Sequence, residues 1–249
     1  MRASWGQNFA LYLRRNVLTT ERLLEAAWME GVGNFVYASS SSVYGPDKGG
    51  PVPEEAVRKP ASPYGVSKLV AEELVGLYAR ERGVPATVLR YFSVYGPRQR
   101  PEMALARFIS AAVEGRSVEI FGDGGQAREM TYVSDVVEAT VAALEQGRRA
   151  TLRTYNVGGG TRTTVNGMLD AVQRATGERV EAVDGVDHDG HLGEARRQPS
   201  VDPGFGIVGV DDVGTEPAEE RTQLGQRQEV PVRGAGPGGV AKADVADAR

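Results

Sequence analysis

Apolar residues recur at helical spacing in several stretches of this chain, and short continuous apolar runs lie between them. The helical spacing predicts helices, at 17–28, 63–82, 104–114, 135–145 and 165–175. The continuous runs predict buried strands, at 35–38, 88–92, 118–121 and 155–157. Strands and helices that alternate in this way predict an α/β fold with a mainly parallel sheet.

Capping residues support two of these helix boundaries. Ser62 followed by Pro63 is typical of an N-cap and a first helical turn, and Gly83 marks the end of the same helix. Gly177 closes the last predicted helix. The local signals therefore agree with the apolar pattern.

The pattern ends near residue 180. Residues 181–249 contain one aromatic side chain, Phe205, and only three Leu or Ile residues, while Gly, Pro, Asp, Glu and Arg dominate. Such a segment buries too little apolar surface to offset the entropy lost on ordering. The sequence predicts one α/β domain over residues 1–180, followed by a low-complexity, disordered tail.

Charge and composition narrow the function classes. A formal net charge of −4 in 249 residues gives no electrostatic reason to expect nucleic-acid binding. No apolar stretch is long enough to span a bilayer, and Met1–Ala10 lacks a signal-peptide core, which favours a soluble cytoplasmic protein. There is no cysteine, and both histidines, His188 and His191, stand late, so we expect neither thiolate chemistry nor a metal site.

Tyr64 and Lys68 stand four residues apart in a predicted helix, which places them on one face. A phenol with a pKa of about 10 is a poor base at neutral pH. A nearby ammonium favours the phenolate and lowers that pKa, so the pair can accept a proton from a substrate hydroxyl. Taken alone, this spacing is common by chance, and an exposed Tyr and Lys on one helix face is the more frequent explanation.

A serine run, Ser39–Ser42, follows the first predicted strand. Ligands of parallel α/β sheets bind at the carboxyl ends of strands. Hydroxyls at this place can hydrogen-bond a sugar, whereas a flexible serine linker is the alternative. The strand that leads directly into the run favours a binding site, in a crevice shared with Tyr64.

Three arginines stand in glycine-rich surroundings: Arg98, Arg100 and Arg128. Guanidinium groups suit two-point contact with phosphate or carboxylate. Each of them taken alone is more often a surface charge, so their meaning depends on the motifs around them.

Six motifs stand together in a fixed order. They are 35–45 (FVYASSSSVYG), 62–68 (SPYGVSK), 89–97 (LRYFSVYGP), 100–104 (RPEMA), 128–135 and 155–160 (YNVGGG). In this order they resemble the NAD-dependent epimerase/dehydratases of the extended short-chain dehydrogenase/reductase family, nearest to UDP-glucose and UDP-glucuronate 4-epimerases. The resemblance covers residues 1–180 and implies a doubly wound, Rossmann-type parallel sheet.

The resemblance implies roles for the candidate residues. Tyr64 is the expected catalytic base, Lys68 is its partner and a contact to the nicotinamide ribose of NAD, and Ser40 binds the reacting sugar oxygen. Tyr64, Lys68 and Ser39 are the expected cofactor contacts. The expected contacts to a UDP-sugar come from Ser40, Ser41, Ser93, Arg100 and Arg128, with the substrate-binding part mainly in 96–130 and 161–180.

The resemblance also implies a reaction and an assembly. The expected reaction is 4-epimerisation by transient oxidation at C4, and the expected assembly is a homodimer through the helix that carries Tyr64 and its neighbour. Dehydratase relatives carry an acidic residue directly before the Val-Tyr-Gly segment or one position earlier. Here those positions are Ser42 and Ser41, which favours an epimerase over a dehydratase.

Two features depart from the family pattern. Relatives begin with a strand and a G-x-x-G-x-x-G turn that binds the pyrophosphate of NAD, and this sequence has no such turn near its start. Gly158–Gly160 come too late and follow another strand. We therefore expect a partial sheet that lacks its first strands, a truncated chain with impaired activity, and a tail unlike the family. The alternatives are a non-catalytic remnant, a UDP-sugar-binding module, or a dehydratase or reductase of the same family.

Overall fold

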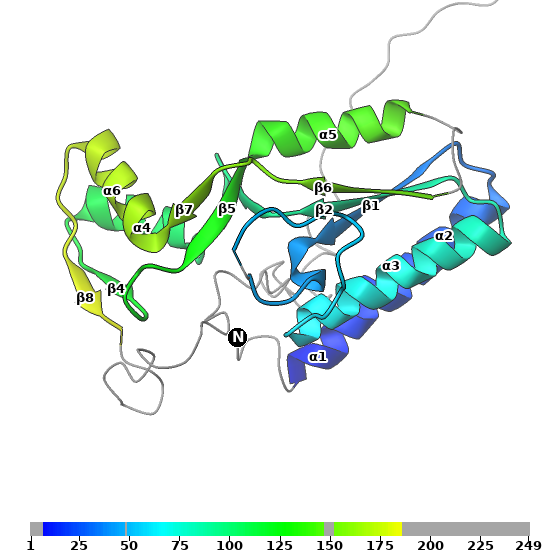
Figure 1. Cartoon of the computed structure of the whole chain (residues 1–249), viewed down its shortest axis with the longest axis horizontal. Coiled ribbons are helices and arrows are strands. Elements are labelled where there is room, and N and C mark those ends of the chain that lie inside the picture. Colours follow the sequence, from blue (N-terminus) through cyan, green and yellow to red (C-terminus); the bar gives the residue numbers. More distant parts are fainter. Residues whose placement is uncertain (1–6, 48, 147–151, 186–249) are drawn as a thin grey trace, which may run out of the picture. The chain divides into compact units, whose positions relative to one another are not determined.

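Three parallel strands form the central sheet of the computed structural model, which describes residues 7–47, 49–146 and 152–185. The strands are β1 (Phe35–Ser40), β2 (Ala86–Tyr91) and β6 (Leu152–Val157), in the order β1-β2-β6 (Figure 1). Because all three run in the same direction, their carboxyl ends lie at one edge of the sheet.

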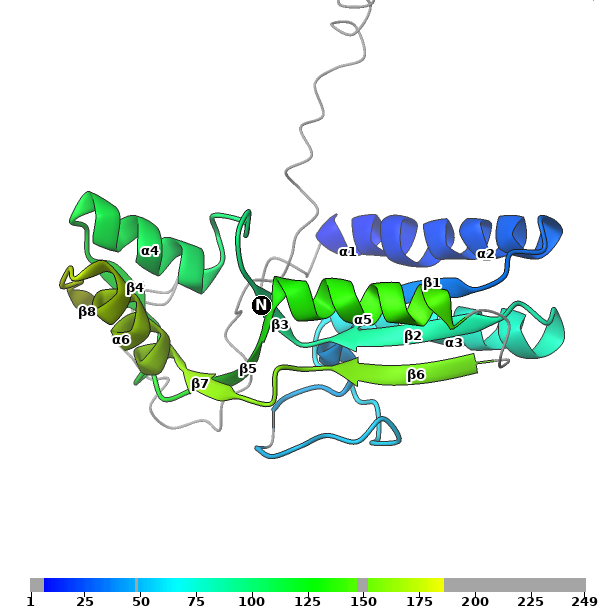
Figure 2. The same ribbon diagram turned by 90° about the horizontal axis from the view of Figure 1, so that it is seen from above.

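Helices cover both faces of this sheet. Helices α2 (Thr19–Met29) and α3 (Pro63–Glu81) lie on one face and α5 (Val133–Glu145) on the other (Figures 1 and 2). Side chains alternate along β2 accordingly, since Val88 packs with α3 and Leu89 with α5. A sheet buried on both faces explains the continuous apolar runs of its strands.

The chain enters α2 through a short helical segment. Helix α1 (Gln7–Tyr12) continues into a π-helical turn (Leu13–Leu18), from which α2 follows without a break. A 3₁₀ turn (Ser41–Val43) follows β1 directly. This turn ends the strand at the edge where the candidate site lies.

The remaining strands belong to smaller sheets. β3 (Ser93–Tyr95) pairs in parallel with β5 (Ala127–Tyr132), which pairs antiparallel with β7 (Arg162–Thr164). β4 (Val118–Ile120) pairs in parallel with β8 (Ala182–Asp184). These strands carry the substrate-side residues that the sequence predicts.

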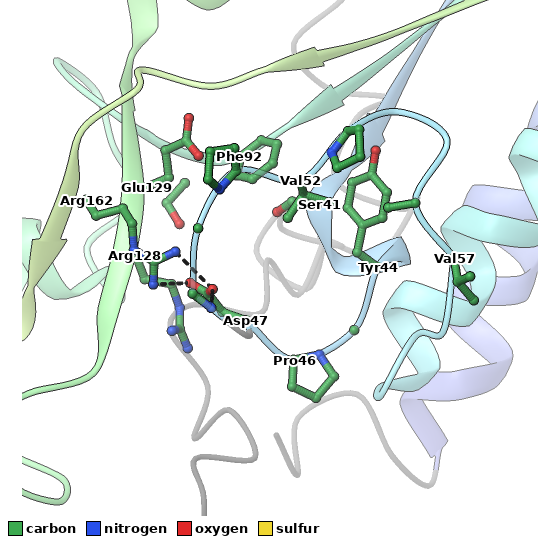
Figure 3. Close-up of a pocket in the computed structure, with 17 residues that line it drawn as sticks. Ser41, Tyr44, Pro46, Asp47, Val52, Val57, Phe92, Arg128, Glu129 and Arg162 are labelled. Atoms are coloured by element: carbon green, nitrogen blue, oxygen red, sulfur yellow. Dashed lines mark hydrogen bonds and ion pairs between the residues drawn. The ribbon is translucent and has the colours of Figure 1, made fainter.

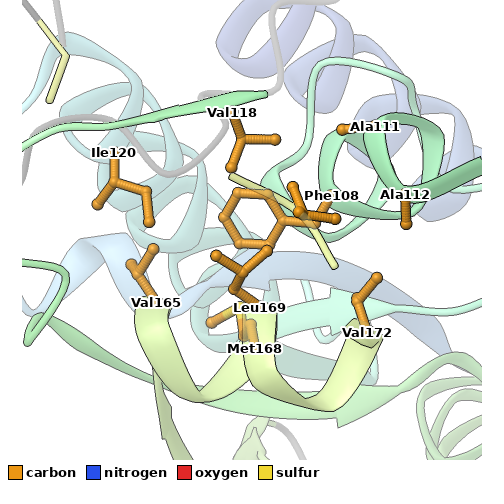
Figure 4. Close-up of a cluster of buried hydrophobic side chains, with 10 residues drawn as sticks. Phe108, Ala111, Ala112, Val118, Ile120, Val165, Met168, Leu169 and Val172 are labelled. Carbon is orange, nitrogen blue, oxygen red and sulfur yellow. The ribbon is translucent and has the colours of Figure 1, made fainter. Parts of the chain in front are cut away.

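Helices α4 (Ala104–Glu114) and α6 (Val165–Thr176) share a hydrophobic core with the strand β4 (Figure 4). The core joins Phe108 of α4 to Leu169 of α6, and Val180 beyond α6 is buried in the same cluster. Ordered packing therefore continues past the end of the last helix.

The five predicted helices and four predicted strands all form, which confirms the α/β fold with a parallel sheet. The predicted boundary at residue 180 is too early, because β8 lies within the range predicted to be disordered. β8 has three residues, of which Asp184 is charged, so no continuous apolar run marks it. Residues 186–249 of the predicted tail lie outside the described residues, as do His188 and His191.

The described residues contain neither a membrane-spanning helix nor a cluster of metal-binding side chains. No helix in that part of the chain combines the length and the apolar character needed to cross a membrane. Within the same residues, no group of three or more His, Cys, Asp or Glu side chains could hold a metal ion.

Candidate functional site

The carboxyl end of β1 and the first turn of α3 form the centre of the candidate site. Ser40 is the last residue of β1, and its hydroxyl accepts a hydrogen bond from the Ser42 amide at 3.1 Å. A Cβ atom at Gly65 would lie only 2.6 Å from the Ser42 carbonyl oxygen, so glycine lets α3 approach the 3₁₀ turn closely. This approach brings Tyr64 next to Ser40.

Tyr64 lies in the first turn of α3, where Ser62 caps the helix by accepting from the Gly65 amide at 3.1 Å. The Ser40 side chain lies close enough to the Tyr64 hydroxyl to act on its pKa, and the Tyr64 ring meets the Tyr12 ring edge-on at 5.7 Å between centres. Burial raises the pKa of Tyr64, whereas Ser40 and the charge of Arg100 lower it. The net direction is opposite to the predicted lowering, because loss of hydration outweighs these contacts.

Lys68 follows on the same face of α3. Its Nζ atom donates to the Ala38 carbonyl at 3.1 Å and lies 5.8 Å from the centre of the Tyr64 ring. Burial lowers the pKa of Lys68, and the carboxylate of Glu72 raises it. The structure thus brings together Ser40, Tyr64 and Lys68.

Ser39 points to the other side of β1. Its hydroxyl donates to the Glu72 carboxylate, and Ser39 is only 4% exposed. Successive strand residues face opposite sides, so the Ser39 side chain does not join Ser40 at the predicted cofactor contact. Its hydroxyl serves the buried cluster beneath the site.

That buried cluster centres on an ion pair that sequence reasoning missed. The Arg90 guanidinium donates to the Glu72 carboxylate at 2.8 and 3.0 Å, and both side chains are nearly inaccessible. Arg90 also donates to the Tyr44 hydroxyl at 2.7 Å, and Tyr44 donates to Asn156 at 2.7 Å. The only sequence signal for Glu72 is its position four residues after Lys68, on the same helix face.

A cavity of about 420 Å³ lies beside this centre, between the loop after β1 and the strands β3, β5 and β7 (Figure 3). Three of the predicted substrate contacts line it: Ser41, Ser93 and Arg128. It is also lined by Asp47 and Arg162, which form an ion pair not predicted from the sequence.

Arg100 and Arg98 follow β3. Arg100 is not among the residues that line the cavity, yet its charge acts on Tyr64. Arg98 is exposed, with a left-handed backbone φ of 64°. The structure therefore places Arg100, but not Arg98, within electrostatic range of the candidate base.

The glycine run Gly158–Gly160 serves strand packing. A Cβ atom at Gly158 would overlap the carboxylate of Glu129, and one at Gly159 would overlap the Met130 carbonyl. The Gly160 amide donates to the Glu129 carboxylate at 3.0 Å. The glycines at 158 and 159 therefore allow the chain after β6 to approach β5 closely.

Comparison with known proteins places these features in context. The model of the NAD dependent epimerase/dehydratase family matches residues 2–158. An uncharacterized UDP-glucose epimerase of Bacillus subtilis is 41% identical over 179 residues, which are 72% of this chain and 56% of that protein. A dTDP-glucose 4,6-dehydratase of Streptomyces griseus is 35% identical over 183 residues, 73% of this chain and 55% of that protein.

A solved structure agrees with these matches. The UDP-glucuronic acid 4-epimerase from Bacillus cereus, in complex with UDP-glucuronic acid and NAD, is 39% identical with a TM-score of 0.69. The match covers 74% of this chain and 58% of the other. The chain thus spans slightly more than half the length of these relatives.

Proposed function

Because the chain belongs to the NAD-dependent epimerase/dehydratase family, we propose that it acts on a nucleotide sugar as a 4-epimerase. The proposed substrates are UDP-glucose and UDP-galactose, or UDP-glucuronate. One observation carries the proposal: Ser40, Tyr64 and Lys68 lie together at the carboxyl end of β1. A base, a cation and a hydrogen-bonding hydroxyl are the groups that oxidation of a sugar hydroxyl requires of the protein.

Tyr64 is the proposed catalytic base. Since Ser40 lies close enough to the Tyr64 hydroxyl to act on its pKa, a sugar oxygen placed beside the two side chains is within reach of both groups. Ser40 orients the 4-oxygen while the Tyr64 oxygen takes its proton and later returns it. The charge of Arg100 supports this role because it favours the ionised form of Tyr64.

NAD is the proposed cofactor, and the groups on α3 fit its nicotinamide half. The ammonium of Lys68 is held against the Ala38 carbonyl beside Tyr64, where both side chains would hold the nicotinamide ribose. When bound, the cofactor would supply the acceptor and donor for a hydride of the sugar C4. In the described part of the chain no strand end carries a G-x-x-G-x-x-G turn for the pyrophosphate.

The nucleotide part of the substrate is proposed to lie in the 420 Å³ cavity. Ser41, Ser93 and Arg128 line it from three different segments, and the guanidinium of Arg128 suits a phosphate. Arg100 is proposed to lie near the sugar, because it acts on Tyr64 from outside the cavity.

An epimerase is favoured over a dehydratase by the residues next to Ser40. Dehydration needs an acid or base at a second carbon, and Ser41 and Ser42 offer hydroxyls in place of a carboxylate. Relatives of both kinds match the chain, so the preference rests on these two serines.

We also propose a homodimer through α2 and α3. Both helices carry large apolar side chains in contact with solvent, among them Leu23 at 54% and Leu77 at 44% exposure. Pairing with a second copy would remove such side chains from water.

The test is epimerisation of UDP-glucose and of UDP-glucuronate, followed by chromatography of the sugar nucleotides. NAD is supplied in large excess, so that cofactor binding does not limit the rate. Tyr64→Phe should lower turnover about 10²-fold or more while leaving UDP-sugar binding intact, since only the proton acceptor is lost. Tyr155→Phe, on β6 and 38% exposed, is the matched control and should retain activity.

Other outcomes separate the alternatives. Near-normal turnover of Tyr64→Phe would show that another group is the base. Binding of UDP-glucose without any 4-epimer at saturating NAD would favour a binding module over an enzyme.

A further inference from the structure

Four charged side chains line the candidate cavity: Asp47, Arg128, Glu129 and Arg162. Their formal charges cancel. Glu129 is engaged with the Gly160 amide at 3.0 Å, whereas Asp47 reaches the cavity from the loop after β1. If Asp47 moved away, two guanidinium groups would face one carboxylate, and the cavity would carry a net positive charge.

Asp47 and Arg162 form a two-point ion pair across the cavity wall. The two guanidinium nitrogens lie 2.9 and 2.8 Å from the two carboxylate oxygens (Figure 3). This fork geometry is the one in which arginine binds free carboxylates and phosphates. Both side chains stay partly in solvent, at 28% exposure for Asp47 and 36% for Arg162.

The loop that carries Asp47 is firmly held at one end. The Asn156 side chain donates to the Val52 carbonyl at 2.7 Å, and Arg90 donates to the Glu54 carbonyl at 2.7 Å. Nearer the tip, the Gly49 amide donates to Asp47 at 2.8 Å, and Gly49 has a left-handed φ of 79°. Asp47 is therefore presented on a glycine turn beyond a fixed base, where small backbone changes can move it.

We propose that Arg162 is a second anion-binding residue of the cavity, and that Asp47 is an internal stand-in displaced by the diphosphate of the substrate. The diphosphate rests on the proposed function, whereas the anion site rests on the ion pair itself. Arg128 acts on the same carboxylate, because its charge together with that of Arg162 lowers the pKa of Asp47. A diphosphate brings more negative charge to these two arginines than one carboxylate does.

Displacement of Asp47 costs little because a partly exposed ion pair is weak. Such pairs are screened by water and contribute little to folding. A ligand that supplies phosphate oxygens to the same fork replaces the lost hydrogen bonds. Removing the Asp47 charge should then strengthen ligand binding, whereas removing Arg162 should weaken it.

The test measures binding of two probes, UDP-glucose and inorganic pyrophosphate, to the full chain by isothermal titration. Asp47→Asn should bind both about two- to fivefold more tightly, the equivalent of releasing one exposed ion pair. Arg162→Gln should bind both roughly tenfold more weakly, with Arg162→Lys between it and the wild type. Arg116→Gln is the control, because Arg116 forms an exposed pair with Glu114 outside the cavity and should bind like the wild type.

The conclusion rests on the opposite effects that Asp47→Asn and Arg162→Gln should have on binding affinity. If both variants weaken binding, or if neither changes it, the ion pair is only a structural tie and the inference fails, while the proposed epimerase can stand. If the two variants change the affinity for pyrophosphate in opposite directions but UDP-glucose neither binds nor reacts, the anion site stands and the proposed function fails. If neither probe binds the wild type, the anion site does not exist.

Discussion

The Tyr64 hydroxyl is subject to opposing influences on its pKa. Burial favours the neutral phenol, whereas Ser40 and Arg100 favour the phenolate. Since burial dominates, Tyr64 of the ligand-free protein keeps its proton at neutral pH. The proposed action of Tyr64 as a base therefore depends on the groups that lower the pKa of its hydroxyl, Ser40 and Arg100.

Ser40→Ala should raise the pKa of Tyr64 further, because it removes a polar neighbour that favours the ionised form. The measurement is a pH titration of phenolate absorbance, with Tyr64→Phe subtracted to isolate this tyrosine. Because the folded pKa lies above the ordinary value of about 10, the stability contributed by the neutral phenol is complete below that pH. It is lost as the pH rises through the folded pKa. Ser110→Ala on α4 should change nothing, and an equal shift in both variants would contradict the assignment.

Sequence reasoning at the residue scale reached the side chains that belong to contiguous motifs. Tyr64 and Lys68 lie four residues apart on one helix and Ser40 ends a strand, and the ordered motifs around them, more than this spacing, singled them out. Arg162 and Asp47 are separated by 115 positions in the chain, and only the folded loop brings them together. Ser39 stays a predicted cofactor contact, while its side chain is buried against Glu72.

At the scale of elements, helix α3 is tied to the central sheet by a buried charge. Glu72 of α3 and Arg90 of β2 lie 2.8 Å apart, at 3% and 5% side-chain exposure. Loss of one partner leaves the other charge buried without compensation. The position of Tyr64 and Lys68 relative to β1 therefore depends on this pair.

Glu72→Gln should lower the free energy of unfolding by about 3–5 kcal/mol, the usual cost of breaking a buried pair. Denaturant unfolding followed by circular dichroism measures it. Glu114→Gln removes an exposed partner of Arg116 and should leave the free energy of unfolding nearly unchanged. Equal losses in the two variants would show that burial does not govern the strength of the Glu72–Arg90 pair.

A second prediction at this scale concerns the contact of α3 with the turn after β1. Gly65→Ala places a methyl group 2.6 Å from the Ser42 carbonyl and should cost about 1–3 kcal/mol, as overpacking does. Gly33→Ala is the control, because no atom lies within 4 Å of its added methyl group. Thermal unfolding of both variants decides the matter, and an unaffected Gly65→Ala would mean that the two elements can separate at no cost.

The sequence predicted the helices and the strands that are continuous apolar runs, and it missed strands that lack such a run. Helices of 11 to 19 residues repeat their apolar pattern several times. β7 and β8 have three residues each, and β5 is rich in polar side chains, so no period appears. Such strands form because a neighbour supplies the hydrogen bonds, which is information outside the segment itself.

At the scale of the whole molecule, the end of the ordered domain lies beyond the last helix. Val180 is 5% exposed within the core of α4 and α6. The Val118 amide donates to the Glu181 carbonyl, and the Gly185 amide donates to the Ile120 carbonyl, both at 2.9 Å. Residues 180–185 therefore belong to the fold, which corrects the predicted boundary at residue 180.

Two truncations test this boundary. A chain that ends at Gly185 should unfold at nearly the same temperature as the full chain, because the residues removed have few apolar side chains. A chain that ends at Gly177 loses the buried Val180 and the pairing of β8 with β4. Burial of one valine contributes about 1.5–3 kcal/mol, and the lost strand exposes Val118 and Ile120 as well, so this chain should melt several degrees lower.

Thermal unfolding by circular dichroism compares the three chains. Identical transitions for both truncations would place β8 outside the cooperative unit, whereas a large loss for the Gly185 chain would show that residues 186–249 stabilise the domain.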